Sequence, residues 1–264
     1  MSPLRCSSLA RLVLLLGLLA GLAACKDAPT EPLTLDLLAD GDQWLAVGMP
    51  QDLPDARTWL PYLRGSPADS LSPAGRVRLL LRAEESQRHA GAPERAFDLS
   101  RQADRIAIRS IARAPDQAVI HAAFSAVDEW RAQMSHGFRS VQPLAALAVS
   151  VVQRQRTEAE AAYAKGDTIR TAALLGAAAG EIRDWSPASV TLRVLARADE
   201  RLQSRQLPEE VTTRAKRLVE SSRREVLSGD PARALREAIY ALQLASGAEV
   251  VEPAADPPGS MARE

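Results

Sequence analysis

Cysteine and aromatic residues are scarce in this chain, and neither sign of charge dominates. Only two cysteines, Cys6 and Cys25, occur among the 264 residues, and both lie near its start. The rest of the chain therefore holds no disulfide and no cysteine metal ligand, which excludes much redox and zinc chemistry. Aromatic residues make up 4% of the sequence, and the plentiful small apolar residues favour packed helices over a β-sandwich. The 33 basic residues balance 33 acidic ones, whereas a general nucleic-acid-binding protein would carry a strong basic excess.

Recognisable catalytic patterns are also missing from the sequence. The three histidines are His89, His121 and His136, and only His89 has a carboxylate, Glu85, at helical spacing. No His-Glu-x-x-His, Glu-x-x-His or Gly-x-Ser-x-Gly pattern occurs, and there is no glycine-rich phosphate loop. We therefore predict no catalytic residue, no metal site and no cofactor. An enzyme would require one of the three histidines to converge with a carboxylate.

The longest apolar run is too short to cross a membrane. It extends over eleven residues, from Leu12 to Leu22, and follows a basic head with Arg5 and Arg11, whereas a membrane-spanning helix needs about 20 residues. A buried core helix is one interpretation of this run. The basic head, the apolar middle and the small residues that follow are more typical of a targeting segment that is removed.

Leu22-Ala23-Ala24-Cys25 resembles the lipobox of bacterial lipoproteins. The resemblance implies cleavage between Ala24 and Cys25, a diacylglycerol thioether on the Cys25 sulfur and an acyl group on its new amine. Residues 1–24 are then a signal peptide, and residues 25–33 are a lipidated tether. By similarity to lipoprotein sorting, Lys26 implies the outer membrane, facing the periplasm, while Asp27 leaves the inner membrane open. Loss of Arg5 and Arg11 leaves a slight acidic excess.

Helical patterns dominate the sequence beyond residue 66. Residues 34–66 are irregular, with a short helix expected from Asp55 to Arg64, and residues 67–247 form the helical domain. We expect helices from Pro73 to Gly91, Pro93 to Arg113, Asp116 to Gly137, Pro143 to Lys165, Asp167 to Trp185, Pro187 to Gln206, from Pro208 onward, and from Pro231 to Gly247. Residues 248–264 carry three prolines and a glycine and are expected to be disordered. The sequence thus predicts an all-α protein.

Three turns share one pattern. Each has a glycine, an arginine four residues later and a small residue five residues later, and an alanine follows seven residues after that. Glycine ends a helix in a left-handed turn at little cost, and aspartate or proline begins the next helix. The pattern predicts antiparallel helical hairpins with turns at Gly91, Gly166-Asp167 and Gly229-Asp230, packed closely through Ala103, Ala178 and Ala241.

These turns resemble those of tetratricopeptide-repeat hairpins, most clearly at Tyr163-Ala164-Lys165-Gly166-Asp167. The chain departs from that family because its turns are 75 and 63 residues apart, where the repeat has 34, and because Thr171 replaces the usual alanine. Any antiparallel helix pair can also use a glycine turn. Two architectures therefore remain open, a short tetratricopeptide-like solenoid and an irregular helical bundle.

Two helical stripes are candidates for binding. Arg101, Arg105, Arg109 and Arg113 recur every four residues, so they form one basic ridge on a helix. Such a ridge suits lipid phosphates or an acidic partner, although Glu94, Asp98 and Asp104 lie close enough in sequence to neutralise it as an ordinary solvated face. The apolar stripe with Phe124, Trp130 and Met134 is either core or the lining of a ligand pocket.

The leading hypothesis is a non-catalytic, lipid-anchored interaction protein of the bacterial envelope. It would be held to the membrane by its N-terminal lipid and would present a helical face to an envelope protein, with no role in nucleic-acid binding. The alternative is a helical binding module for a small apolar or anionic ligand. An envelope enzyme is the third hypothesis.

Overall fold

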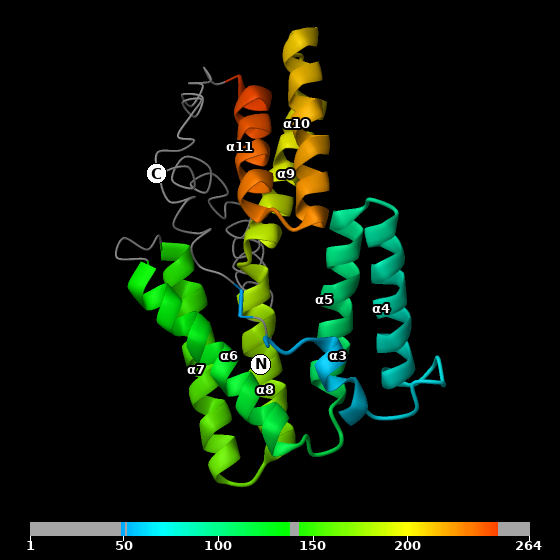
Figure 1. Ribbon diagram of the computed structural model, residues 1–264, viewed down its shortest axis with the longest axis vertical. Helices are drawn as coiled ribbons and strands as arrows, with labels where there is room; N and C mark the ends of the chain where they lie inside the picture. Colours follow the sequence, from blue (N-terminus) through cyan, green and yellow to red (C-terminus); the bar gives the residue numbers. More distant parts are fainter. Residues whose placement is uncertain (1–48, 51, 138–142, 248–264) are drawn as a thin grey trace, which may run out of the picture. The chain divides into compact units, whose positions relative to one another are not determined.

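The computed structural model describes residues 49–50, 52–137 and 143–247 (Figure 1). The expected signal peptide, Cys25, the tether and the expected disordered tail lie outside the described residues. Within the described part, the chain forms helices and a single isolated β-bridge between Leu63 and Ile111. The all-α prediction is confirmed.

The helices follow one another with short connections. They are α3 (Ala56–Trp59), the 3-10 turn η1 (Leu60–Tyr62), α4 (Pro73–His89), α5 (Pro93–Ser110), α6 (Gln117–Gly137), α7 (Pro143–Ala164), α8 (Thr168–Asp184), α9 (Pro187–Ser204), α10 (Glu209–Ser228) and α11 (Pro231–Ser246). Ser72 and Ser186 cap α4 and α9 through their hydroxyls, each with proline at the first helical position. These local signals account for most helix starts.

Two expected helices end earlier than predicted. The short helix expected from Asp55 to Arg64 is α-helical only over Ala56–Trp59 and ends in the 3-10 turn at Tyr62. α5 ends at Ser110 rather than at Arg113, because Ile111 leaves the helix to pair with Leu63. The N–H groups of Ala112 and Arg113 both donate to the carbonyl oxygen of Tyr62, at 2.9 and 3.1 Å. A strand-like contact with a distant segment thus replaces the last helical turn, and Arg113 lies beyond the helix.

Three hairpins share one turn geometry. Gly91, Gly166 and Gly229 have φ values of 74, 76 and 88°, which glycine adopts without the steric cost of a Cβ. In each turn the next residue donates its N–H to a carbonyl five residues earlier, at 2.9, 3.0 and 3.1 Å. Asp167 and Asp230 then cap α8 and α11 by accepting backbone N–H bonds at 3.0 Å. Figure 1 shows α4 beside α5 and α10 beside α11.

The hairpins also share one packing register. The buried positions lie seven residues before each glycine, five residues after it and twelve residues after it. They are Glu84, Ala96 and Ala103 in the first hairpin, Ala159, Thr171 and Ala178 in the second, and Ser222, Ala234 and Ala241 in the third. In the third hairpin the Ser222 hydroxyl donates to the carbonyl of Ala234 at 2.7 Å. Except for Glu84, the side chains at these positions are small and let the paired backbones approach closely.

Each hairpin is accompanied by the helix that precedes it. α3 contacts α5, α6 contacts α8 and α9 contacts α11, so each added helix packs on the second helix of its hairpin. The C-terminal ends of α9 and α11 lie next to each other, where Arg205 donates to the carbonyl oxygen of Ser246 at 2.6 Å. The described chain is therefore built from three groups of the same plan, each a helix followed by a glycine hairpin.

The second helices of the first two hairpins, α5 and α8, run antiparallel to each other. A Cβ at Gly176 on α8 would lie 2.9 Å from Ile108 Cγ1 and 3.0 Å from Trp59 Nε1. Ion pairs join the two helices further along, at residues 101 and 184 and at residues 104 and 183. At Gly180, one turn after Gly176, an added Cβ would meet no atom within 4 Å. The helices thus touch at Gly176 and leave space at Gly180.

Alanine at these two glycines is expected to have opposite effects on stability. Glycine inside a helix costs about 1 kcal/mol relative to alanine, so Gly180→Ala should raise the free energy of unfolding by about 0.5–1 kcal/mol. Gly176→Ala should lower it by about 1–2 kcal/mol, because overpacking against the Trp59 ring outweighs the helical gain. Urea unfolding followed by circular dichroism measures both changes, and a stabilised Gly176→Ala chain would contradict the close contact.

Candidate functional site

The main candidate is a groove between α5 and α8, and three arginines of the predicted basic ridge line it. The hollow has a volume of about 240 Å³. Its lining residues are Phe97, Ser100, Arg101, Asp104, Arg105, Ile108 and Arg109 of α5 with Ala177, Gly180, Arg183 and Asp184 of α8. The groove thus combines small and apolar residues with four arginines and two aspartates.

The two aspartates each pair with one arginine and leave two arginines unpaired. Arg101 lies 2.6 Å from an Asp184 carboxylate oxygen, and Arg183 lies 2.8 Å from an Asp104 carboxylate oxygen. Arg105 and Arg109 are exposed and make no hydrogen bond or ion pair within the described part of the chain. Because guanidinium groups bind carboxylates and phosphates through paired charge-assisted hydrogen bonds, these two side chains are suited to an anionic ligand.

Asp104 is committed to the fold. Its side chain is 8% exposed, and one oxygen accepts the Ala56 N–H at 2.7 Å. Its partner Arg183 also donates to the carbonyl of Pro54 at 2.7 Å. Burial raises the pKa of Asp104, while Arg183 and the Ala56 N–H act in the opposite direction. The pair therefore fixes the start of α3 against α5 and α8 and is not available to a ligand.

Asp184 lies in a strongly positive environment at the end of α8. Burial raises the pKa of Asp184, and the opposing influences all come from arginines, led by Arg101 and followed by Arg193, Arg105 and Arg183. The Arg101 guanidinium also lies 5.8 Å from the centre of the Phe97 ring, so Arg101 is held from two sides. One carboxylate among several arginines leaves an excess of positive charge, which favours a further anion.

The structure unites three of the four predicted ridge arginines and separates the fourth. Arg101, Arg105 and Arg109 line the groove, whereas Arg113 is exposed beyond the end of α5. The residues from α8 were missed because no sequence signal pairs α8 with α5. Glycines inside a helix at positions 176 and 180, with no turn to require them, were an available hint.

The histidines do not form a catalytic cluster within the described residues. His89 is exposed at the end of α4, and His121 is exposed, with Nε2 at 3.3 Å from the Tyr163 hydroxyl. The side chain of His136 lies outside the described residues. No three His, Cys, Asp or Glu side chains of the described part are grouped to hold a metal ion.

The apolar stripe on α6 belongs to the core. Trp130 and Met134 are 1% and 2% exposed. Phe124 is half-buried, and its ring packs edge-on against Tyr163 while the Arg156 guanidinium lies 5.3 Å from its centre. These residues are therefore already engaged with the protein, which weakens the case for an apolar ligand between them.

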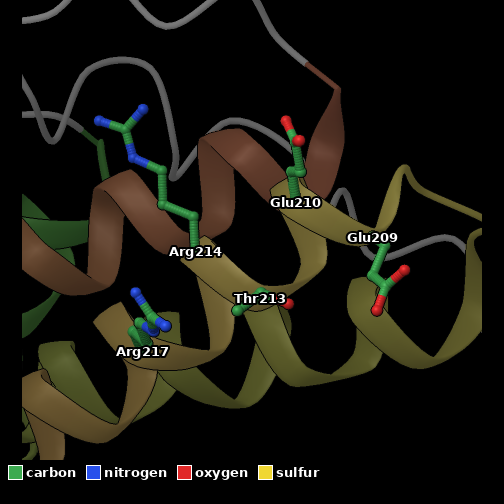
Figure 2. A pocket seen from close by; sticks show the side chains of 5 residues that line it. All are labelled: Glu209, Glu210, Thr213, Arg214 and Arg217. Carbon is green, nitrogen blue, oxygen red and sulfur yellow. The ribbon is translucent and has the colours of Figure 1, made fainter.

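A second hollow of about 590 Å³ lies on α10 and is less suited to a specific ligand. Its described lining is Glu209, Glu210, Thr213, Arg214 and Arg217. Figure 2 shows that all five side chains project from this one helix and point in different directions. The two glutamates and two arginines of this described lining balance each other, so the hollow offers no net charge.

Comparisons with known proteins give no family for this chain. No protein-family model matches it, and neither curated proteins nor solved structures show significant similarity to it. In the described part of the chain, no helix has both the length and the apolar character needed to cross a membrane. The groove between α5 and α8 is therefore the main structural basis for assigning a function.

Proposed function

We propose that this chain is a non-catalytic, lipid-anchored helical interaction protein of the bacterial envelope, and that it docks an acidic partner in the groove between α5 and α8. The main support for this docking site is that Arg105 and Arg109 line the hollow, are exposed and form no ion pair among the described residues. The other two arginines of the hollow, Arg101 and Arg183, are each paired with an aspartate. A carboxylate brought to these arginines gains charge-assisted hydrogen bonds without breaking an existing ion pair.

The membrane anchor rests on the resemblance of residues 22–25 to a lipobox. Two or more acyl chains on Cys25 would hold the protein stably at a membrane surface, and Lys26 favours the outer membrane, facing the periplasm. The shared register of the three hairpins supports tetratricopeptide-like pairing, in an irregular array because the turns are 75 and 63 residues apart. Such hairpins are frameworks that present surfaces to partner proteins.

A small anionic ligand is the second candidate for the groove, because the same arginines would bind it. The volume of the hollow favours a docked protein segment. Pockets for drug-sized molecules measure about 300–1,000 Å³, whereas this hollow measures about 240 Å³. It has room for one or two side chains of a partner, so a docked protein segment fits it better than a complete small molecule.

Charge reversal in the groove is expected to abolish partner capture. A C-terminally tagged chain purified from detergent-solubilised membranes should carry a stoichiometric partner, and Arg105→Glu/Arg109→Glu should lower its recovery at least tenfold. Each lost charge-assisted hydrogen bond is worth about 1.5–3 kcal/mol, and two repulsive charges replace the lost ones. The recovery of the partner, measured by quantitative mass spectrometry, checks this.

Arg95→Glu/Arg113→Glu is the matched control, because both arginines are exposed, neither lines the groove, and the net charge changes by the same amount. A Cys25→Ser chain tests the anchor separately and should lose the partner through mislocalisation. If the wild-type chain enriches no partner, or if the two double variants lose it equally, the docking proposal is wrong.

A further inference from the structure

Gly180 leaves part of the groove unfilled. A Cβ at this position would meet no atom within 4 Å, whereas at Gly176 it would lie within 3.0 Å of both Ile108 and Trp59. Gly180 is inside α8 and does not have a positive φ, so neither a turn nor a close neighbour requires glycine there, although it costs about 1 kcal/mol relative to alanine. Phe97, Ile108 and Ala177 line the same groove.

The unpaired arginines lie on the other wall of the same hollow. Arg105 and Arg109 are one helical turn apart on α5, so their side chains emerge about 5–6 Å from each other, and Ile108 lies between them in sequence on the same wall. The groove therefore offers an open space at Gly180, called here the apolar seat, with two cationic groups beside it. A ligand that fills both parts carries an apolar side chain flanked by carboxylates.

A membrane surface fits this groove less well than a peptide. Anionic headgroups attract clusters of outward-pointing basic side chains on a flat surface, whereas these arginines line a hollow that also contains the carboxylates of Asp104 and Asp184. A flat plane of phosphates does not follow the shape of such a hollow. A peptide can place individual acidic groups at Arg105 and Arg109 and avoid the two aspartates.

From this geometry we infer that the groove recognises a short acidic segment of a partner protein with one apolar side chain between its acidic residues. The apolar side chain sits over Gly180, and the flanking carboxylates bind Arg105 and Arg109. Gly180 is then a specificity-determining residue, because any side chain there would occupy the seat. The inference rests on the proposed docking function and names the chemistry of its partner.

The test uses the full chain in detergent and a fluorescein-labelled peptide, Glu-Glu-Leu-Glu-Glu, with binding measured by fluorescence anisotropy at low salt. Replacing the leucine of the peptide by glycine should weaken binding about 5–10-fold, since burial of a leucine side chain contributes about 1.5–3 kcal/mol when complete. Replacing its glutamates by glutamine should weaken binding at least tenfold. Gly180→Leu should weaken binding of the leucine peptide about tenfold and make the leucine and glycine peptides equal.

Two controls show whether a loss of peptide binding comes from an unstable variant or from any added leucine. Gly180→Leu places its side chain in open space on a helix, so its unfolding midpoint should not fall below that of the wild type. Ala122→Leu, at an exposed position on α6, should leave peptide binding unchanged.

Three results would overturn the inference. If the leucine and glycine peptides bind the wild-type chain equally and Gly180→Leu changes neither, the apolar seat is wrong, while loss of binding in Arg105→Glu/Arg109→Glu would still support the docking function. If no acidic peptide binds, acidic-segment recognition is wrong. If vesicles of phosphatidylglycerol and phosphatidylcholine bind in place of the peptide and require the same arginines, the groove recognises lipid headgroups.

Discussion

Asp104→Ala is expected to lower the free energy of unfolding by about 3–5 kcal/mol. The substitution leaves the mostly buried Arg183 guanidinium without its carboxylate, and breaking a buried ion pair from one side costs about 3–5 kcal/mol. It also removes the acceptor of the Ala56 N–H, which Asp104 holds at 2.7 Å. Chemical unfolding followed by circular dichroism measures the loss.

Asp98→Ala is the matched control for this loss. Asp98 lies on the same helix, is exposed, and makes no hydrogen bond or ion pair within the described residues. Its removal should change stability by no more than about 0.5 kcal/mol. If Asp98→Ala and Asp104→Ala lowered the free energy of unfolding equally, the Asp104–Arg183 ion pair would not stabilise the packing of α5 on α8.

Comparison of Asp104→Asn with the wild type across pH tests the direction of the shift in the pKa of Asp104. Burial raises the pKa of Asp104 in the folded chain above its ordinary value of 3.8, so the folded state binds a proton more readily than the unfolded state. The stability gained by protonation is complete below the ordinary pKa and is lost as the pH rises through the folded pKa. As the pH falls from about 7 toward 4, the wild type should therefore gain stability relative to Asp104→Asn. A difference that does not change with pH would contradict this.

Trp59→Ala is expected to lower the free energy of unfolding by about 3–5 kcal/mol, the usual cost of truncating a large buried aromatic residue. Trp59 is 1% exposed, although it belongs to a helix of only four residues. Its Nε1 atom lies against Gly176 of α8, and α3 also contacts α5. The Trp59 side chain thus packs where α3 meets α5 and α8. Urea unfolding of the full chain measures the effect.

Trp59→Phe separates the stability contributed by ring packing from the cost of the buried indole N–H. The buried Trp59 N–H has no hydrogen-bond partner in the described part of the chain, and a buried unsatisfied donor costs about 1–3 kcal/mol. Phenylalanine removes that donor and keeps most of the ring, so its loss should be no more than about 2 kcal/mol. If Trp59→Ala costs less than about 1 kcal/mol, the short helix α3 is not part of the core that supports the groove.

Local features of the sequence predicted the helices and turns well. Proline and serine mark helix starts, and glycine at 91, 166 and 229 marks the hairpins, because these residues act on the backbone next to them. The end of α5 was wrong because it depends on a pairing between Ile111 and Leu63, which are far apart in sequence. Local periodicity continues through Arg113 and cannot register such a contact.

The groove could be predicted only in part. The spacing of Arg101, Arg105 and Arg109 identified one wall, since residues four apart share a helix face. The opposite wall comes from α8, where Asp184 pairs with Arg101 across 83 residues of sequence. The sequence offered Glu94, Asp98 and Asp104 as nearby partners for the arginines, yet Asp104 pairs with Arg183 and Glu94 with Arg223. Which arginines stay free is decided by tertiary packing, and only the structure shows it.

Site-specific photo-crosslinking in living cells tests the docking function most directly. A photoreactive amino acid at Ser100, at the edge of the groove, should give a discrete crosslinked product with one partner protein. The same residue at Gln102, exposed on α5 but outside the groove, should not give this product, and Arg105→Glu/Arg109→Glu should abolish the product from Ser100. Absence of a product from Ser100, or the same product from both positions, would contradict the assignment of this groove as the docking site.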